Sequence, residues 1–172
     1  MMALFKQLNG RDRYHDSSAR EDVINYILRP DKTLSGCIGW VNVDMRNPAA
    51  SMAQVAKFYG KENGIQLRHF VLSFCQEEVD DPDVANEIAQ QITYFISQEY
   101  QTIYAVHEDT DQVHIHFVYN PISYLDGHRY RGTKTEYYRL INFLKILLHR
   151  YEIHKLFEVS FKSGLDIQNN YE

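Results

Sequence analysis

Hydrophobic residues recur along this chain with two different spacings, which separate candidate strands from candidate helices. Alternating or short continuous apolar runs predict strands at residues 4–8, 38–43, 67–75, 102–107, 113–119 and 155–161. Apolar residues three or four positions apart predict helices at residues 19–28, 48–63, 84–100 and 135–151. Helices and strands therefore alternate along most of the chain.

Local signals predict where the first two helices begin and end. Ser18 followed by Glu21 has the spacing of a capping box, so we expect the first helix to start directly after Ser18. Pro30 ends that helix, because a residue that precedes proline is disfavoured in the helical conformation. Pro48 suits the first turn of the second helix, and Gly64 is expected to close it.

Two adjacent predicted strands, at 102–107 and 113–119, are joined by the polar connection EDTDQ. A short polar connection between apolar strands is typical of a β-hairpin, whose strands are antiparallel. We therefore expect an α/β (α+β) fold with a central, mostly antiparallel five-stranded sheet flanked by helices. The 172 residues fit a single domain, because no repeat or linker divides them.

The composition indicates a globular protein rather than a disordered one, with 44% hydrophobic and 24% charged residues. Cys37 and Cys75 lack the Cys-x-x-Cys spacing and are expected to be reduced thiols. No segment is apolar and long enough for a signal peptide or a membrane span. We therefore expect a cytoplasmic protein without a membrane partner.

The net charge of -5 argues against a simple basic DNA-binding module, but the charge is unevenly distributed. Residues 69–128 contain eleven acidic residues and no Lys or Arg, whereas the rest of the chain has a net charge of +6. The acidic middle is consistent with a solvated helix and loop. The basic flanks are equally consistent with a surface that meets a polyanion.

The most informative segment is HEDTDQVHIHFVYN, residues 107–120. Residues two apart in a strand share a face, so His114 and His116 point the same way and Ile115 points to the core. If the turn is centred between residues 110 and 111, His107 lies opposite His114, with Cβ atoms roughly 5 Å apart. Three imidazoles then converge on one face of the sheet, which is improbable as a chance arrangement of structural histidines.

Three neutral imidazoles suit a divalent ion such as Mn, Co, Ni or Zn. Structural zinc sites usually have four protein ligands, often Cys, and no Cys is near this cluster, so an open catalytic site is the better interpretation. Such an ion would hold a phosphate oxygen and stabilise negative charge. An acidic residue of the connection, Glu108, Asp109 or Asp111, would orient an imidazole through its second nitrogen, and Asp109 is the candidate catalytic acid.

The segment 107–120 resembles the third motif of the conjugative relaxases, mobilisation nucleases of the P type (MobP-like) in the HUH endonuclease superfamily. DVINYILRPDKT, residues 22–33, resembles the first motif of that family and HFVLSF, residues 69–74, resembles the second. The resemblance implies that Tyr26 is the nucleophile and that Ser73 helps to place DNA near the cleaved phosphate.

The resemblance further implies a reaction, a metal and partners. A relaxase nicks one strand at a transfer origin, becomes attached to the 5′ phosphate through Tyr, and later reverses the step. The expected cofactor is Mn or Mg, with Zn, Co or Ni as alternatives. The expected partners are origin-of-transfer DNA, single-stranded or as a hairpin, an accessory DNA-binding protein and a coupling protein. Relaxases of this kind often continue into a longer C-terminal region, which suggests a nuclease-domain fragment.

Other tyrosines keep alternative hypotheses open. Without the resemblance, Tyr26 would be an ordinary tyrosine of an amphipathic helix, and Tyr14 is the second candidate nucleophile. Tyr137 and Tyr138 lie on a helix downstream of the histidines, as in rolling-circle replication initiators and transposases of the same superfamily. A third hypothesis is a non-catalytic single-stranded-DNA-binding module with a structural metal.

Basic residues interleaved with tyrosines after the hairpin suit a single strand, because bases stack on aromatic rings and phosphates pair with cations. The candidate DNA contacts are Arg129, Arg131 and Lys134. Further basic residues of this region and of the N-terminal segment could line the same groove; they are Arg139, Lys145, Arg150, Lys6, Arg11, Arg13 and Arg20. A solvated helix face is the alternative interpretation.

Overall fold

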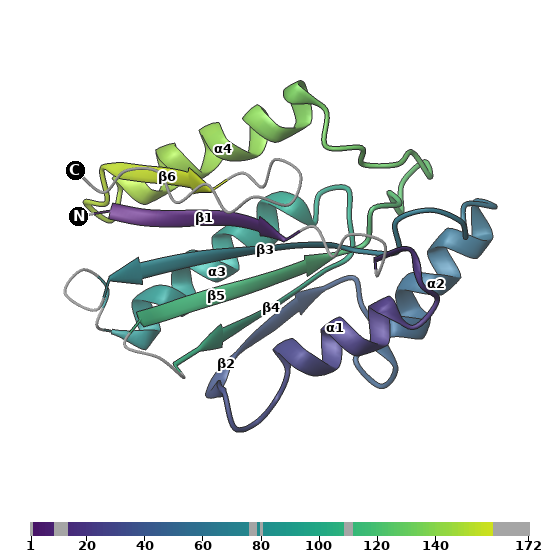
Figure 1. Ribbon diagram of the computed structural model, residues 1–172, viewed down its shortest axis with the longest axis horizontal. Helices are drawn as coiled ribbons and strands as arrows, with labels where there is room; N and C mark the ends of the chain where they lie inside the picture. The colour runs from purple at the N-terminus through teal and green to yellow at the C-terminus, as the bar shows by residue number, and fades with distance from the viewer. Residues whose placement is uncertain (1, 9–13, 76–78, 80, 109–111, 160–172) are drawn as a thin grey trace.

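The computed structural model describes residues 2–8, 14–75, 79, 81–108 and 112–159. This part of the chain forms six strands and four helices, in an α+β arrangement (Figure 1). The strands are β1 (Met2–Leu8), β2 (Thr33–Val41), β3 (Arg68–Cys75), β4 (Thr102–His107), β5 (Gln112–Tyr119) and β6 (Lys155–Val159). The helices are α1 (Ala19–Ile27), α2 (Pro48–Phe58), α3 (Pro82–Ile96) and α4 (Lys134–His149).

The six strands form one sheet in the order β2-β4-β5-β3-β1-β6. Neighbouring strands are antiparallel except at one edge, where β1 and β6 run parallel. The mostly antiparallel sheet flanked by helices is thus confirmed, with six strands instead of five because both terminal strands join it. β2 also begins at Thr33, earlier than expected, and its pairing with β4 shifts register between Thr33 and Ile38.

α1 starts directly after Ser18, as predicted, but two predictions about the residues that cap or close helices are wrong. The Ser18 side chain makes no capping bond to α1 and instead donates a hydrogen bond to Asp22, so no capping box forms there. α2 ends at Phe58 because Gly60 adopts a left-handed conformation with φ 65° and the N–H of the next residue reaches back to the helix. That bond pattern is a common helix terminus, so Gly60, rather than Gly64, closes α2.

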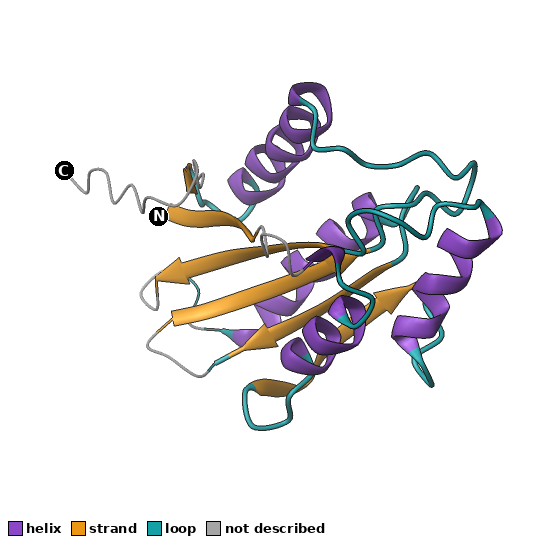
Figure 2. Ribbon diagram, turned by 45° about the vertical axis from the view of Figure 1, so that its right-hand side comes forward, coloured by secondary structure: helices purple, strands orange, loops and turns teal. Residues whose placement is uncertain are grey.

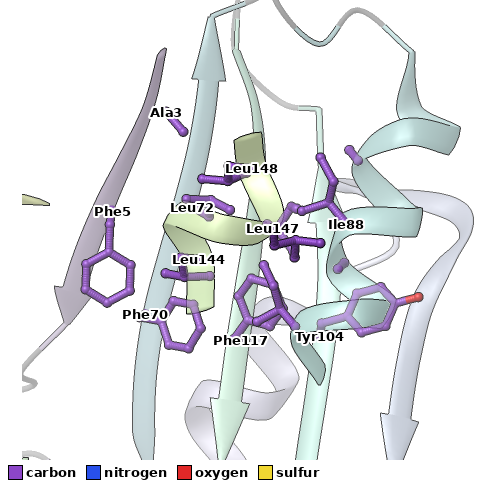
Figure 3. Packing of buried hydrophobic residues seen from close by; sticks show 14 of the residues in the cluster. Ala3, Phe5, Phe70, Leu72, Ile88, Tyr104, Phe117, Leu144, Leu147 and Leu148 are labelled. Carbon is purple, nitrogen blue, oxygen red and sulfur yellow. The ribbon is translucent and has the colours of Figure 1, made fainter. Parts of the chain in front are cut away.

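The sheet has two differently covered faces (Figures 1 and 2). α3 and α4 pack on one face against alternate strand residues, including Phe70, Leu72 and Phe117, in the larger hydrophobic core. Figure 3 shows Leu144, Leu147 and Leu148 of α4 among these strand residues. α1 and α2 cover the other face, where a smaller core forms; its buried members are Ala19, Ile24, Ile27, Val43, Met52, Leu67, Ile103, Ala105 and Val118.

The central hairpin has the predicted register. His107 pairs with His114 across β4 and β5, and Ser73 of β3 pairs with His114 from the other side. Since alternate residues share a face, His107, His114 and His116 lie on the same face as α1 and α2. Ile115 and its alternate neighbours lie in the larger core, as the alternation predicts.

We expect Thr133→Ala to lower the free energy of unfolding by about 1 kcal/mol. The Thr133 hydroxyl accepts a hydrogen bond from the N–H of Glu136, whose carboxylate accepts one from the N–H of Thr133, and the substitution removes half of this capping box. Urea denaturation of Thr135→Ala is the matched control, because Thr135 is exposed in the same helical turn and makes no cap. Equal stability of the two variants would contradict the capping role.

Candidate active site

The three histidines of the central hairpin converge on one point. A ligand-capable nitrogen from each of His107, His114 and His116 lies within 4.8 Å of the others. The ring centroids of His107 and His116 are 4.3 Å apart, and those of His114 and His116 are 5.2 Å apart. His107 and His116 are buried and His114 is half-buried, so the cluster reaches the surface at His114.

The end of α1 orients His107. Nε2 of His107 donates a hydrogen bond of 2.7 Å to the backbone carbonyl of Ile27, the last residue of α1. The last carbonyls of a helix have no partner within the helix, and this one also accepts from the Thr33 hydroxyl. Because Nε2 carries the proton, Nδ1 of His107 carries the lone pair that can bind a metal.

Of the three acidic residues expected to orient an imidazole, Glu108 is the one that lies among the described residues. The backbone N–H of Glu108 donates to the carbonyl of Lys32, which ties the end of β4 to the segment after α1. Asp109 and Asp111 lie outside the described residues. For His107, therefore, a helix-terminal carbonyl occupies the place that an acid was expected to take.

His116 is held from the neighbouring strand. Its Nδ1 lies 2.9 Å from Nε2 of His69 on β3, and Nδ1 of His69 lies 3.0 Å from the hydroxyl of Tyr14. The other nitrogen of His116, Nε2, is buried without a hydrogen-bond partner in the described part of the chain. A buried polar atom that lacks a partner requires an explanation, and a bound ion supplies one here, because the atom lies in a cluster of three imidazoles.

Burial keeps these imidazoles neutral. Desolvation lowers the pKa of His116 to about 2, with further lowering by the neighbouring histidines, and lowers the pKa of His69 to about 3. A metal binds the neutral form of histidine, so His116 is in its ligand form at neutral pH. The donor set, three neutral nitrogens, fits a divalent ion of borderline softness with coordination positions left open.

The structure brings Tyr26 to this cluster. Tyr26 precedes the last residue of α1, and its ring centroid lies 5.7 Å from that of His116 and 6.2 Å from that of His107. The Nζ of Lys32 lies 5.9 Å from the same ring centroid. The Tyr26 side chain is 43% exposed, so a polymer could approach it from solvent while the histidines lie beneath.

The other candidate tyrosines lie elsewhere. Tyr14 contacts the nitrogen of His69 that faces away from His116, and burial raises its pKa to about 12. Tyr137 and Tyr138 belong to α4, which packs on the opposite face of the sheet, and the Tyr137 hydroxyl donates to the carboxylate of Glu158. Of the four tyrosines considered from the sequence, Tyr26 is the one whose ring contacts the histidines of the hairpin.

Ser73 lies next to the cluster. It pairs with His114 in the β3–β5 register, and directly opposed residues have Cβ atoms about 5 Å apart. In β3, Phe70 and Leu72 enter the larger core, while His69 and Ser73 take the other face. Ser73 is half-buried and thus borders the cluster at its accessible side.

The candidate DNA contacts differ in their surroundings. Arg131 and Lys134 are exposed where the chain enters α4. The guanidinium of Arg129 instead donates to three backbone carbonyls of the connection between α2 and β3, those of Lys61, Asn63 and Ile65.

The other basic and aromatic residues of these segments also lie in different surroundings, as far as the structure describes them. Arg20 is buried, with a relative exposure of 6%; this burial lowers its pKa, and charge repulsion from Arg129 lowers it further. Arg11 and Arg13 lie outside the described residues. Tyr130 is buried beneath the guanidinium of Arg68, so it does not offer its ring to a base.

Sequence reasoning missed four contributors to the site. The alternation in β3 could have identified His69, which shares a face with Ser73. The Ile27 carbonyl belongs to a class, helix-terminal carbonyls, that always needs a partner. No sequence pattern points to Tyr14 as a partner of His69 or to Lys32 as a neighbour of Tyr26, because both contacts depend on how loops fold back.

Comparison with known proteins gives a consistent picture. Residues 26–153 match the family described as relaxase, MobA/VirD2-like, nuclease domain. Two proteins from Staphylococcus aureus, each named Protein rlx, are 30% and 29% identical to this chain over 113 residues. Each aligned region covers 66% of this chain and 34% of the relative, so the chain spans about a third of the curated relatives' length. No solved structure is a significant match.

No helix in the described part of the chain has the length and apolar character that a membrane span needs.

The depressed pKa values of His69 and His116 predict an acid-sensitive fold. Unfolded histidine takes up a proton below about pH 6.5, whereas the folded residues stay neutral down to about 3 and about 2. The unfolded state then binds more protons, so the contribution of each residue is complete above pH 6.5 and is lost progressively below it. The loss is about 1.4 kcal/mol per pH unit for each histidine.

The measurement is the free energy of unfolding of the metal-free protein between about pH 7 and pH 4.5, in the presence of a chelator. We expect His69→Gln to give a shallower slope than the wild type. Val71→Ala, on the same strand and face as His69, is the control and should keep the wild-type slope, because it removes no titratable group. Parallel curves for all three proteins would show that His69 does not contribute.

Proposed function

Because the chain belongs to the family of MobA/VirD2-like relaxase nuclease domains, we propose that it nicks one strand of a transfer-origin DNA through Tyr26. The observation that carries the proposal is the contact of the Tyr26 ring with His107 and His116. The product is a 5′-phosphotyrosine ester, used for mobilisation or conjugative transfer. The proposal concerns the nuclease domain, since the matched relatives are longer proteins.

His107, His114 and His116 are the proposed metal ligands. A divalent ion held there would neutralise charge on the scissile phosphate, which otherwise repels an anionic nucleophile. Three neutral ligands suit this purpose, because they leave the charge of the ion uncompensated. Mn²⁺ or Mg²⁺ is the proposed ion, and Zn²⁺, Co²⁺ and Ni²⁺ are alternatives that the nitrogen ligands would also accept.

Tyr26 is the proposed nucleophile. The phenol loses its proton, the bond from Oη to phosphorus forms, and the bond from phosphorus to the 3′ oxygen breaks, so that this oxygen takes up a proton. The charge of Lys32 near the Tyr26 ring can attract the phosphate that Tyr26 attacks. One phosphate ester replaces another, so the reverse reaction can reseal the strand without an external energy source.

Ser73 and Asp109 have supporting roles in the proposal. Ser73 borders the cluster beside His114, where its hydroxyl can donate to a phosphate oxygen next to the cleaved bond. Asp109 follows the first ligand of the hairpin by two residues and is proposed to assist proton transfer or ligand orientation during the reaction.

The alternative enzymes of the superfamily would use a tyrosine on a downstream helix. The position of α4 on the opposite face of the sheet argues against Tyr137 or Tyr138 in that role. A non-catalytic DNA-binding module is the remaining alternative, and it predicts DNA binding without cleavage. The intact set of three histidines beside an accessible tyrosine favours the enzyme.

The proposed partners follow from the charge of the domain. A domain with net charge -5 should bind nonspecific DNA weakly at physiological salt. We therefore propose that recognition of single-stranded or hairpin origin DNA is assisted by an accessory DNA-binding protein. From the family, we also propose that a coupling protein receives the covalent complex.

The test of the nucleophile uses single-stranded oligonucleotides tiled across the transfer origin of the element that carries the gene. With Mn²⁺, we expect a covalent protein–DNA species on a denaturing gel for the wild type and none for Tyr26→Phe or in excess EDTA. Tyr137→Phe and Tyr138→Phe are matched controls, since they remove the same hydroxyl from the other face, and both should form the species.

The outcomes distinguish the three hypotheses. An adduct formed by Tyr26→Phe but lost in Tyr137→Phe or Tyr138→Phe would favour an initiator or transposase. DNA binding by the wild type without an adduct for any oligonucleotide would favour the non-catalytic module. Tyr14→Phe should still form the adduct, because its hydroxyl lies behind His69.

A second prediction separates DNA contacts from structural arginines. Arg131→Gln and Lys134→Gln should weaken binding of a labelled single strand and reduce the slope of log K against log salt by about 0.7 for each lost phosphate contact. Arg129→Gln should instead lower the free energy of unfolding by about 1–3 kcal/mol, because backbone carbonyls lose their donor. Fluorescence anisotropy and urea denaturation measure the two effects, and the exposed residue Lys57 provides the control variant, Lys57→Gln.

An unchanged salt slope in Arg131→Gln and Lys134→Gln would mean that DNA follows another path across the domain. If Arg129→Gln is as stable as the wild type but binds DNA more weakly, Arg129 contacts a DNA phosphate.

A further inference from the structure

A buried row of hydrogen bonds leads away from the histidine cluster along the face of the sheet. His116 Nδ1 contacts His69 Nε2 at 2.9 Å, and His69 Nδ1 contacts the Tyr14 hydroxyl at 3.0 Å. His69 has a relative exposure of 3% and His116 of 4%. The three side chains come from different parts of the fold: β5, β3 and the loop before α1.

The direction of these bonds follows from the proposed ligand role of His116. Nε2 is the nitrogen without a partner, so it is the one that can offer a lone pair to a metal. The proton of a neutral imidazole must then be on Nδ1 of His116, which donates to Nε2 of His69. His69 in turn carries its proton on Nδ1 and donates to the oxygen of Tyr14. With Nε2 of His116 on a metal, this is the single arrangement of neutral rings that satisfies both bonds.

We propose that His69, itself held by Tyr14, is a positioning residue that sets the tautomer and ring orientation of His116 for metal binding. This inference rests on the proposed function, in which His116 is a metal ligand. Neither His69 nor Tyr14 contacts the reacting atoms, and their effect passes through His116.

The choice of an imidazole as the outer partner has a consequence for the charge of the site. Metal-bound histidines commonly donate to a carboxylate or to a backbone carbonyl. His107 donates to the carbonyl of Ile27, and His116 donates to a neutral imidazole, so both outer partners are uncharged. A carboxylate at the position of His69 would bring a negative charge to the side of the metal that must attract phosphate.

A purely structural role for His69 is the competing explanation. The ring centroids of His69 and His116 are 5.2 Å apart, with an angle of 38° between the ring planes. Burial of such a ring stabilises the core independently of the hydrogen bonds that its nitrogens make. The two explanations differ in what a substitution does. Packing depends on volume, whereas positioning depends on an acceptor at the place of Nε2.

Four variants of the full chain separate these explanations. His69→Leu keeps much of the volume and removes the acceptor, whereas His69→Gln puts an amide oxygen where Nε2 was. Tyr14→Phe removes the outer end of the row. Val71→Ala is the matched control, since Val71 lies on the same strand and face, pairs with His116, and loses volume without losing an acceptor.

The readouts are zinc affinity by titration calorimetry and the protonated nitrogen of His116 by ¹⁵N NMR of the zinc-bound protein. Loss of an outer partner typically weakens metal binding by about 10–100-fold, which is the loss we expect for His69→Leu. His69→Gln, Tyr14→Phe and Val71→Ala should each stay within a few-fold of the wild type. In the wild type, His116 should carry its proton on Nδ1. Thermal unfolding checks that each variant is folded, and His69→Asn, whose amide is too short, replaces His69→Leu if the latter does not fold.

Three results would overturn the inference: zinc affinity of folded His69→Leu equal to the wild type, an equally large loss in Val71→Ala, or a proton on Nε2 of His116. A wild type that binds zinc no better than the triple alanine variant of His107, His114 and His116 is a different result. That result would contradict the proposed metal site itself. The first three results contradict only the role of His69 and leave the proposed metal site standing.

Discussion

The hydrogen bond from His107 to the backbone carbonyl of Ile27 connects the two parts of the candidate site. It ends α1 against the sheet and, because Tyr26 is the neighbouring residue of the same helical turn, it also sets where the Tyr26 ring lies. The bond satisfies a carbonyl that the helix leaves without a partner. It also places the proton of His107 on Nε2, which leaves Nδ1 to bind a metal. The smaller core also packs α1 on the sheet, and this bond adds a directed polar contact at the site itself.

The division of the sheet into two faces explains how a polar cluster exists inside a small domain. α3 and α4 complete an apolar core on one face, so the other face can hold buried histidines without exposing the main core to water. Alternation along β5 achieves this with adjacent residues, since Ile115 enters the core while His114 and His116 face α1. The same division separates the tyrosines of α4 from the cluster.

The charge of the site is unusual for a domain that is acidic overall. The proposed ligands are neutral, and their outer partners among the described residues are a carbonyl and a second imidazole. The bound ion would therefore be the dominant local charge, and Lys32 adds to it near Tyr26. Attraction of a phosphate to such a site does not require a basic protein, which fits a net charge of -5.

The sequence by itself determined the type and order of the elements, the hairpin register, and the common face of His107, His114 and His116. These follow from strand alternation and turn length, which act over a few residues. Only the tertiary structure decided the partners of the ligands. The bonds of His107 with Ile27 and of His69 with Tyr14 join residues 80 and 55 positions apart, and Arg129 binds carbonyls more than 60 residues away. Such contacts depend on how helices and loops pack on the sheet, and local spacing contains no information about that.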